Sequence, residues 1–261
     1  MFDTAISAAI NAGNEILKIY NDPSSDFSVQ KKADNSPLTI ADKASHQVID
    51  SQLKNTGLPV LSEEGRDIPY EERKNWQQFW MVDPLDGTKE FIKQNGEFTV
   101  NIALIKNTKP VAGIIYVPVT RTLYFGDVKT GAWKLENAEG DITLKDLVNR
   151  GHKLPHNDQP RNFTIVGSRS HANAETKTYI ENRKKEHEKI DIISKGSSLK
   201  ICMVAEGLAD EYPRFGPTME WDTAAGHAIA NAAGKKLWQT DLKNELTYNE
   251  ENLLNPFFIV K

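Results

Sequence analysis

The chain has little cysteine, no excess of positive charge and no long apolar run, and each shortage excludes a class of protein. Its 261 residues include one cysteine, Cys202, so no disulfide can form within the chain. The formal net charge of −4 argues against a general nucleic-acid or acidic-membrane binder. No apolar run approaches the roughly 20 residues of a membrane helix, and no signal peptide is evident around Asp3. We expect a cytoplasmic protein without a transmembrane segment.

The remaining composition is that of an ordinary globular protein, with 39% hydrophobic and 26% charged residues. Apolar periodicity predicts helices over 3–20, 39–53, 171–189, 197–207 and 222–233. It predicts strands over 59–61, 76–82, 98–105, 112–117, 122–125, 163–166, 190–193, 235–238 and 257–260. This alternation indicates α/β layers. Residues 144–160 are polar, and we place a domain boundary within 127–160.

The most informative segment follows the apolar run 79–82 and reads Asp83-Pro84-Leu85-Asp86-Gly87-Thr88. Two carboxylates here leave a strand end and enter a Gly-Thr turn. Carboxylates are the oxygen ligands that Mg²⁺ prefers, and the turn amides can bind a phosphate. Asp-Pro and Asp-Gly are also common in ordinary turns, so the segment could simply be a turn after a strand. Phosphatases of the haloacid dehalogenase type end their first motif in Asp-Gly-Thr too, but their aspartates are two apart, whereas these are three apart.

Two further places offer carboxylates to a metal. Glu63 and Glu64 directly follow a predicted strand, although a surface acidic pair is an equally simple interpretation, and we favour it for Glu64. Asp222 stands at the start of an alanine-rich helix, where it is a natural N-cap. A capping carboxylate that faces a cleft can also bind a metal, so both interpretations of Asp222 stay open.

Three other positions offer phosphate or proton chemistry, each with a structural alternative. Thr39 and Asp42 have the spacing of a capping box. Ser197 and Lys200 open a helix with free amides, which suits an anion, although Ser197 could simply cap that helix. Arg214 lies in a proline-rich loop, where it could bind a phosphate or pair on the surface.

Together these motifs resemble the magnesium-dependent, lithium-sensitive phosphatases that include inositol monophosphatase and fructose-1,6-bisphosphatase. The shared motifs are Glu63-Glu64, the 83–88 segment and Trp221-Asp222-Thr223-Ala224-Ala225-Gly226. Within this superfamily the chain is most similar to the bacterial 3′(2′),5′-bisphosphate nucleotidases of the CysQ type. That similarity spans nearly the whole chain and includes 32–37, 88–104, 168–171, 196–200 and 212–217.

The resemblance implies a layered αβαβα sandwich of two subdomains with the site at their junction. Residues 1–135 would be an α+β subdomain with most metal ligands. Residues 136–261 would carry the nucleotide-binding residues and Asp222. One Mg²⁺ would bind Glu63, Asp83 and the Leu85 carbonyl, and a second would bind Asp83, Asp86 and Asp222. Two or more Mg²⁺ ions are expected, with inhibition by Li⁺.

In the implied reaction, a water activated by the metals attacks the phosphate, and no phosphoenzyme forms. The expected catalytic residues are Asp42, Thr88 and Glu63, with Thr39 supporting Asp42. Gly87 and Thr88 would bind the scissile phosphate through their amides. The substrate-binding residues expected in all are Glu63, Leu85, Asp86, Gly87, Thr88, His171, Ser197, Lys200, Arg214 and Asp222.

The expected substrate is adenosine 3′,5′-bisphosphate (PAP), cleaved to AMP and phosphate, with the sulfated form PAPS as a second substrate and a role in sulfate assimilation. The Ser197, Lys200 and Arg214 cluster would hold the 5′-phosphate. An inositol or sugar monophosphatase on the same scaffold is the alternative enzyme. A catalytically silent nucleotide-binding module is the alternative from another class. The oligomeric state, the PAP or PAPS preference and peripheral attachment to the inner face of the cell membrane stay open.

Overall fold

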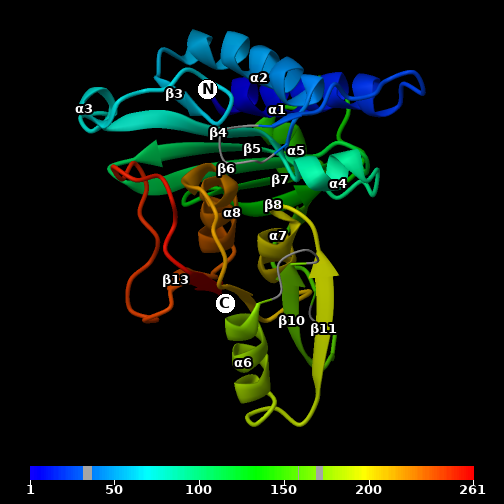
Figure 1. Cartoon of the computed structure of the whole chain (residues 1–261), viewed down its shortest axis with the longest axis vertical. Coiled ribbons are helices and arrows are strands. Elements are labelled where there is room, and N and C mark those ends of the chain that lie inside the picture. Colours follow the sequence, from blue (N-terminus) through cyan, green and yellow to red (C-terminus); the bar gives the residue numbers. More distant parts are fainter. Residues whose placement is uncertain (32–36, 158, 169–172) are drawn as a thin grey trace.

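Two antiparallel helices cover one face of the largest sheet in the computed structural model, which describes residues 1–31, 37–157, 159–168 and 173–261. Helix α1 spans Phe2–Tyr20 and α2 spans Ile40–Leu53. Figure 1 shows both at the top of the molecule, above the sheet. Helix α1 buries one stripe that includes Ile6, Ile10 and Ile16, as its apolar periodicity predicts.

The sheet beneath these helices has seven strands in the order β3-β4-β5-β6-β7-β8-β9. The strands are Val60–Ser62, Gln78–Asp86, Thr99–Lys106, Lys109–Val117, Thr122–Asp127, Gly131–Leu135 and His152–Lys153. Strands β3 and β4 run parallel, and the other neighbours are antiparallel. Every residue of β5 except Lys106 is buried, because helices cover both faces of the sheet.

Helices α7 (Leu199–Glu206) and α8 (Glu220–Ala232) lie on the other face of this sheet. Two strand glycines allow α8 to approach closely. A Cβ atom at Gly113 would overlap the carbonyl oxygen of Ala225, and one at Gly126 would lie 2.6 Å from Cα of Ile229. The backbone of α8 therefore packs directly against the backbone of the sheet at these two glycines.

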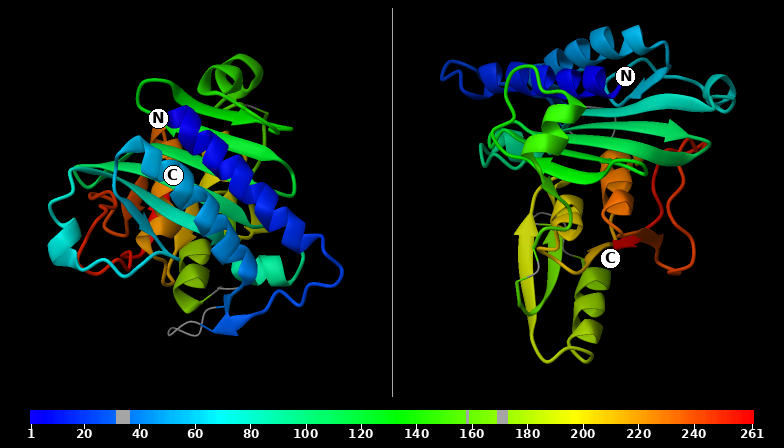
Figure 2. Two further views of the ribbon diagram at one scale, coloured as in Figure 1. Left: turned by 90° about the horizontal axis from the view of Figure 1, so that it is seen from above. Right: turned by 180° about the vertical axis from the view of Figure 1, so that it is seen from behind.

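Below α7 and α8 lie two small sheets. Strands β10 (Phe163–Ser168) and β11 (Ile190–Lys195) pair in parallel, and a three-stranded sheet has the order β12-β14-β13. Its strands are Tyr212–Arg214, Phe258–Val260 and Leu237–Gln239. Helix α6 (Ala174–Arg183) lies beside them, at the end of the molecule away from α1 (Figures 1 and 2). The layers follow the expected αβαβα order.

The remaining elements are short. They are β1 (Gln30–Lys31), β2 (Pro37–Leu38), the 3-10 turn η1 (Lys54–Thr56), α3 (Tyr70–Arg73), α4 (Thr88–Ile92) and α5 (Leu144–Arg150). None of the helices in the described ranges is long and apolar enough to cross a membrane. Cys202 is a buried free thiol, as its apolar surroundings predict.

The predicted elements are found near their expected positions, and one of them is clearly shorter than predicted. Helix α6 ends at Arg183 instead of reaching residue 189, because 184–189 contains no apolar side chain to pack. Strand β8 and helix α5 were not predicted. Helix α5 buries only Leu147, so its apolar signal is weak, although Thr143 and Asp146 form a readable capping box. The division of the chain at residue 135 stays a prediction.

Candidate active site

The acidic segment after the sheet core forms the end of β4 and the start of α4. Pairing between β4 and β5 is regular up to Asp83 and shifts before Asp86, as expected where Pro84 offers no amide to the ladder. The amide of Leu85 donates to Oδ1 of Asp83 over 3.0 Å. Gly87 then takes a φ of 94° at the N-cap of α4, a conformation that favours glycine. This irregular turn directs the segment out of the sheet.

Three carboxylates converge beside this turn. Glu63, Asp83 and Asp222 each offer an oxygen, and these atoms all lie within 4.8 Å of one another. Burial raises the pKa of Asp83 and that of Asp222 well above the ordinary value, and the neighbouring carboxylates raise both further. A divalent cation relieves this repulsion, so the donor set fits Mg²⁺.

Asp222 reaches the cluster from the first turn of α8, but the N-cap interpretation is wrong. Helix α8 begins at Glu220 with Met219 as its N-cap residue, so Asp222 occupies the third helical position. Its Oδ2 accepts a hydrogen bond from the Met219 amide over 2.8 Å. The helix begins two residues earlier than expected because the Glu220 amide donates to the Leu253 carbonyl, which holds that residue in place.

Asp42 links the start of α2 to the start of α4. The predicted capping box is present: Oδ2 of Asp42 accepts from the amide and the hydroxyl of Thr39, at 2.7 and 2.6 Å. The other oxygen, Oδ1, accepts from the hydroxyl of Thr88 over 3.2 Å. The capping role and a role in the site therefore coexist in one carboxylate.

The serine pair before α7 lies against the acidic turn. The N-cap residue of α7 is Ser198, not Ser197, and Ser197 takes a left-handed φ of 43°. The amide and the hydroxyl of Ser198 both donate to Oδ2 of Asp86 over 2.6 Å. Asn101 donates to the Ser198 hydroxyl over 2.8 Å. These contacts use the Ser198 hydroxyl, so it does not cap the helix.

Lys200 and Arg214 place two cations nearby. Lys200 is buried, and burial lowers the pKa of its ammonium to about 8. Arg214 is only 9% exposed at the end of β12, so the interpretation of a surface ion pair is wrong. Its Nη2 donates to the Pro217 carbonyl over 2.8 Å, whereas its buried Nε has no hydrogen-bond partner among the described residues. Burial follows from the strand position, since β14 pairs with it.

One cavity of about 560 Å³ unites these groups. Of the expected site residues, it is lined by Glu63, Asp86, Gly87, Thr88, Ser197, Lys200, Arg214 and Asp222. Asp83, Asp42 and Leu85 lie behind this lining, and His171 is outside the described residues. The cavity thus has an acidic side, formed by Glu63, Asp86 and Asp222, and a cationic side, formed by Lys200 and Arg214. Asp222 comes from the same half of the chain as the two cations.

Sequence reasoning missed three polar residues of this region: Glu90, Asn101 and Ser198. Glu90 and Ser198 line the cavity, and Asn101 holds Ser198 from behind. Asn101 could have been noticed as a polar residue within an otherwise apolar strand. Ser198 was quoted within its motif, but its contact with Asp86 has no sequence signal.

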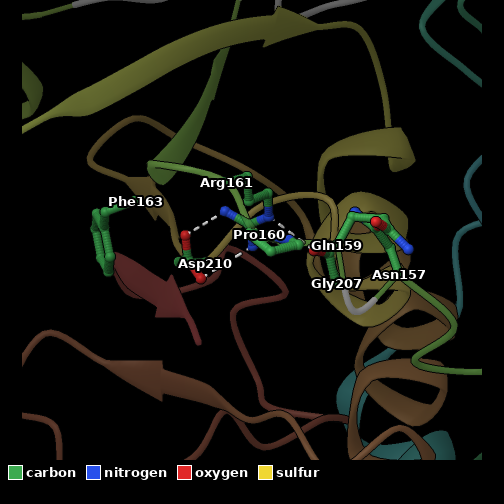
Figure 3. A pocket seen from close by; sticks show the side chains of 7 residues that line it. All are labelled: Asn157, Gln159, Pro160, Arg161, Phe163, Gly207 and Asp210. Carbon is green, nitrogen blue, oxygen red and sulfur yellow. Dashed lines mark hydrogen bonds and ion pairs between the residues drawn. The ribbon is translucent and has the colours of Figure 1, made fainter.

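A second hollow, of about 410 Å³, lies between the segments 157–163 and 207–210 (Figure 3). The Arg161 guanidinium is directed at Asp210 there, with Nη2 3.0 Å from Oδ1, and its Nε donates to the Gly207 carbonyl over 3.0 Å. Because Asp210 neutralises Arg161, this hollow offers neither a free cation nor a carboxylate cluster. It shares no residue with the active-site cavity.

The chain belongs to the inositol monophosphatase family, whose profile matches residues 1–256. It is 48% identical to the 3′(2′),5′-bisphosphate nucleotidase CysQ of Escherichia coli (strain K12), covering 100% of this chain and 99% of that protein. It is 31% identical to the nucleotidase of the same name from Haemophilus influenzae, covering 100% and 92%.

Solved structures agree with this assignment. The crystal structure of CysQ from Bacteroides thetaiotaomicron is 55% identical, with a TM-score of 0.91 over 99% of this chain and 95% of that one. An inositol monophosphatase from Thermotoga maritima has a TM-score of 0.73 at 20% identity, covering 100% and 91%, which shows the shared fold. The predicted fold class and the predicted family are thereby confirmed.

Proposed function

We propose that this protein is a magnesium-dependent phosphatase that removes the 3′-phosphate of adenosine 3′,5′-bisphosphate to give AMP, and that it also acts on PAPS. Its role is to clear PAP during sulfate assimilation in the cytoplasm. The observation that carries the proposal is one cavity with a carboxylate cluster on one side and Lys200 and Arg214 on the other. The similar proteins named above carry the nucleotidase name over their full length.

The carboxylate side holds the metals. Glu63, Asp83 and the Leu85 carbonyl would hold one Mg²⁺, and Asp83, Asp86 and Asp222 a second. When bound, the cations make a water more acidic and offset the charge of the reacting phosphate. Asp83 would belong to both ligand sets, which agrees with its place beside Glu63, Asp86 and Asp222 and with its burial, with 2% exposed. We propose that Li⁺ inhibits by competing at this cluster.

Asp42 and Thr88 handle the proton. The Thr88 hydroxyl donates to Asp42, so its lone pairs are free to accept from a water beside the scissile phosphate. Oδ1 of Asp42 is then positioned to receive that proton through Thr88, while Thr39 holds Oδ2. Glu63, whose carboxylate lies within 4.8 Å of those of Asp83 and Asp222, completes the proposed catalytic set. The amides of Gly87 and Thr88 bind the phosphate at the start of α4.

The cationic side binds the second phosphate. Ser197, Lys200 and Arg214 would receive the 5′-phosphate, together with His171. Within the part of the chain that the structure describes, the buried Nε of Arg214 has no partner, which leaves donor capacity beside the cavity. A monophosphate has no use for these cations, so they favour a bisphosphorylated nucleotide. This asymmetry argues against the inositol or sugar monophosphatase alternative.

A catalytically silent nucleotide-binding module would have lost a metal ligand or a proton-handling residue. The sequence retains all of Asp42, Glu63, Asp83, Asp86, Thr88 and Asp222. We also propose that residues 1–135 and 136–261 form the two subdomains. The cavity draws its acidic wall mainly from the first and its cationic wall from the second.

Phosphate release from the purified protein tests the function. PAP, inositol 1-phosphate and fructose 1,6-bisphosphate are supplied in parallel, each with Mg²⁺, with EDTA and with added Li⁺. We expect fast release from PAP that EDTA abolishes and Li⁺ inhibits. Preference for inositol 1-phosphate would support the monophosphatase instead. If no phosphate is released from any of the three substrates but the nucleotide still binds, the non-catalytic module is supported.

A further inference from the structure

The peptide group between Ser197 and Ser198 joins the two sides of the cavity. Its carbonyl oxygen, on Ser197, accepts from Nζ of Lys200 over 2.5 Å. Its N–H, on Ser198, donates to Oδ2 of Asp86 over 2.6 Å. One planar unit therefore contacts a cation of the phosphate side and a carboxylate of the metal side. Because the peptide group is planar, its C=O and N–H groups keep a fixed orientation relative to each other, so neither can turn without the other.

Ser198 extends this connection through its side chain. Its hydroxyl contacts the Asp86 carboxylate at 2.6 Å and the backbone carbonyl of Asp222 at 3.1 Å. Ser198 is 3% exposed, and Asn101 donates to it from β5. Through one residue, the loop before α7 touches two of the expected metal ligands.

The same loop is pinned to the sheet on its other flank. The Gly196 amide donates to Oε2 of Glu97 over 2.8 Å, and the hydroxyls of Ser197 and Thr99 lie 3.2 Å apart. Ser197 itself keeps a left-handed backbone, which a non-glycine residue adopts only where its surroundings hold it. The loop thus contacts the segment 97–99 on one flank and the metal side on the other.

We propose that this Ser197–Ser198 connector couples nucleotide binding to metal binding, so that an anion at Lys200 tightens Mg²⁺ binding at Asp86. The proposal rests on the proposed function. An anion that engages Lys200 and Ser197 fixes the loop, and the fixed loop holds the Asp86 carboxylate in its metal-binding orientation. Linkage requires the reverse effect as well: bound Mg²⁺ tightens binding of the anion by the same factor.

Calorimetric titration of the whole protein with Mg²⁺ tests this coupling, with and without saturating AMP. AMP carries the 5′-phosphate but no 3′-phosphate, so no turnover interferes, and adenosine serves as the probe without an anion. In the native protein we expect AMP to tighten Mg²⁺ binding about 10-fold, within the usual range of such couplings. Adenosine should leave it unchanged.

Ser198→Ala keeps every charge but removes the hydroxyl that contacts Asp86 and Asp222. We expect the AMP effect to fall below about 2-fold in this variant. Ser51→Ala, on the exposed side of α2, is the matched control and should keep the native effect. Asn101→Ala provides a second variant, since it removes the amide that donates to the Ser198 hydroxyl over 2.8 Å and to Oδ2 of Asp86 over 3.4 Å, and it should also weaken the coupling.

Three outcomes would overturn the inference or its basis. An equal AMP effect in native protein and Ser198→Ala would mean that the contacts of the Ser198 hydroxyl with Asp86 and Asp222 do not carry the coupling. If saturating AMP leaves the Mg²⁺ affinity of the native protein unchanged, the two sites are not coupled. If AMP does not bind at all, the proposed anion site is wrong, and the proposed function is contradicted as well.

Discussion

The hydroxyl of Thr88 lies 3.2 Å from Oδ1 of Asp42, and this contact joins residues 46 positions apart. The other oxygen of Asp42 is held at the start of α2 by the amide and the hydroxyl of Thr39. One carboxylate oxygen therefore stabilises a helix, and the other is directed at the residue that faces the scissile phosphate in the proposed reaction. The two oxygens of Asp42 therefore have separate roles, and a substitution can change one role without the other.

Asp42→Asn should lower kcat by about 10²- to 10⁴-fold, because the amide cannot accept a proton. The amide oxygen of Asn can still accept from Thr39, so the free energy of unfolding should fall by no more than about 1 kcal/mol. Steady-state kinetics and urea unfolding measure the two effects. Asp50→Asn, farther along the same helix, is the control. A variant with near-native kcat would remove Asp42 from the mechanism.

Asp83→Asn should abolish turnover and yet stabilise the metal-free protein. Burial and neighbouring carboxylates raise the pKa of Asp83, so its contribution to stability is present below the unfolded pKa of about 3.9. That contribution is lost as the pH rises through the raised pKa. In EDTA at pH 7 the variant should therefore have the higher melting temperature, and Mg²⁺ should reverse the order. Equal melting temperatures in EDTA would contradict this explanation.

Binding of the 5′-phosphate should weaken above about pH 8, where the buried ammonium of Lys200 loses its proton. The KM for PAP should rise there while kcat changes little. Lys200→Arg keeps a charge throughout this range, and its KM should show no such rise. The folded pKa lies below the unfolded one, so protein stability should increase between about pH 8 and the unfolded pKa of about 10.4. A flat KM across pH 8 in the native protein would count against this role.

Arg214→Ala should raise the KM for PAP by at least about 10-fold, the effect of losing one charged hydrogen bond of about 1.5 kcal/mol or more. Turnover of inositol 1-phosphate, however slow, should be nearly unaffected, since a monophosphate leaves this side of the cavity empty. Arg150→Ala, on the exposed end of α5, is the control. Parallel losses for both substrates would mean that Arg214 does not act through the 5′-phosphate, and an unchanged KM for PAP would favour the monophosphatase alternative.

Gly113→Ala should destabilise the fold, because its methyl group would overlap the backbone of α8 at Ala225. Overpacking of this kind costs about 1–3 kcal/mol. Since α8 carries Asp222, Mg²⁺ affinity should fall as well. Gly167→Ala is the matched control, because no atom of the described residues lies within 4 Å of its added methyl group. Chemical unfolding measures the difference, and equal stabilities would mean that the close contact is easily relieved.

The sequence by itself determined the features that depend on short spacings. The carboxylates after β3 and β4, the glycine turn at Gly87 and the capping box of Thr39 and Asp42 can all be read from neighbouring residues. The long apolar helices and strands were also predictable, because periodicity reports which side is buried. Weakly apolar elements such as α5 and β8 were not.

Only the tertiary structure decided which distant groups meet. Ser198 reaches Asp86 across 112 positions, and the Leu253 carbonyl holds the start of α8, which makes Asp222 a third-position residue instead of an N-cap. Arg214 is buried because β14 pairs with its strand. Such contacts depend on how the helices pack on the sheet, and that packing cannot be predicted from the spacing of residues along the chain.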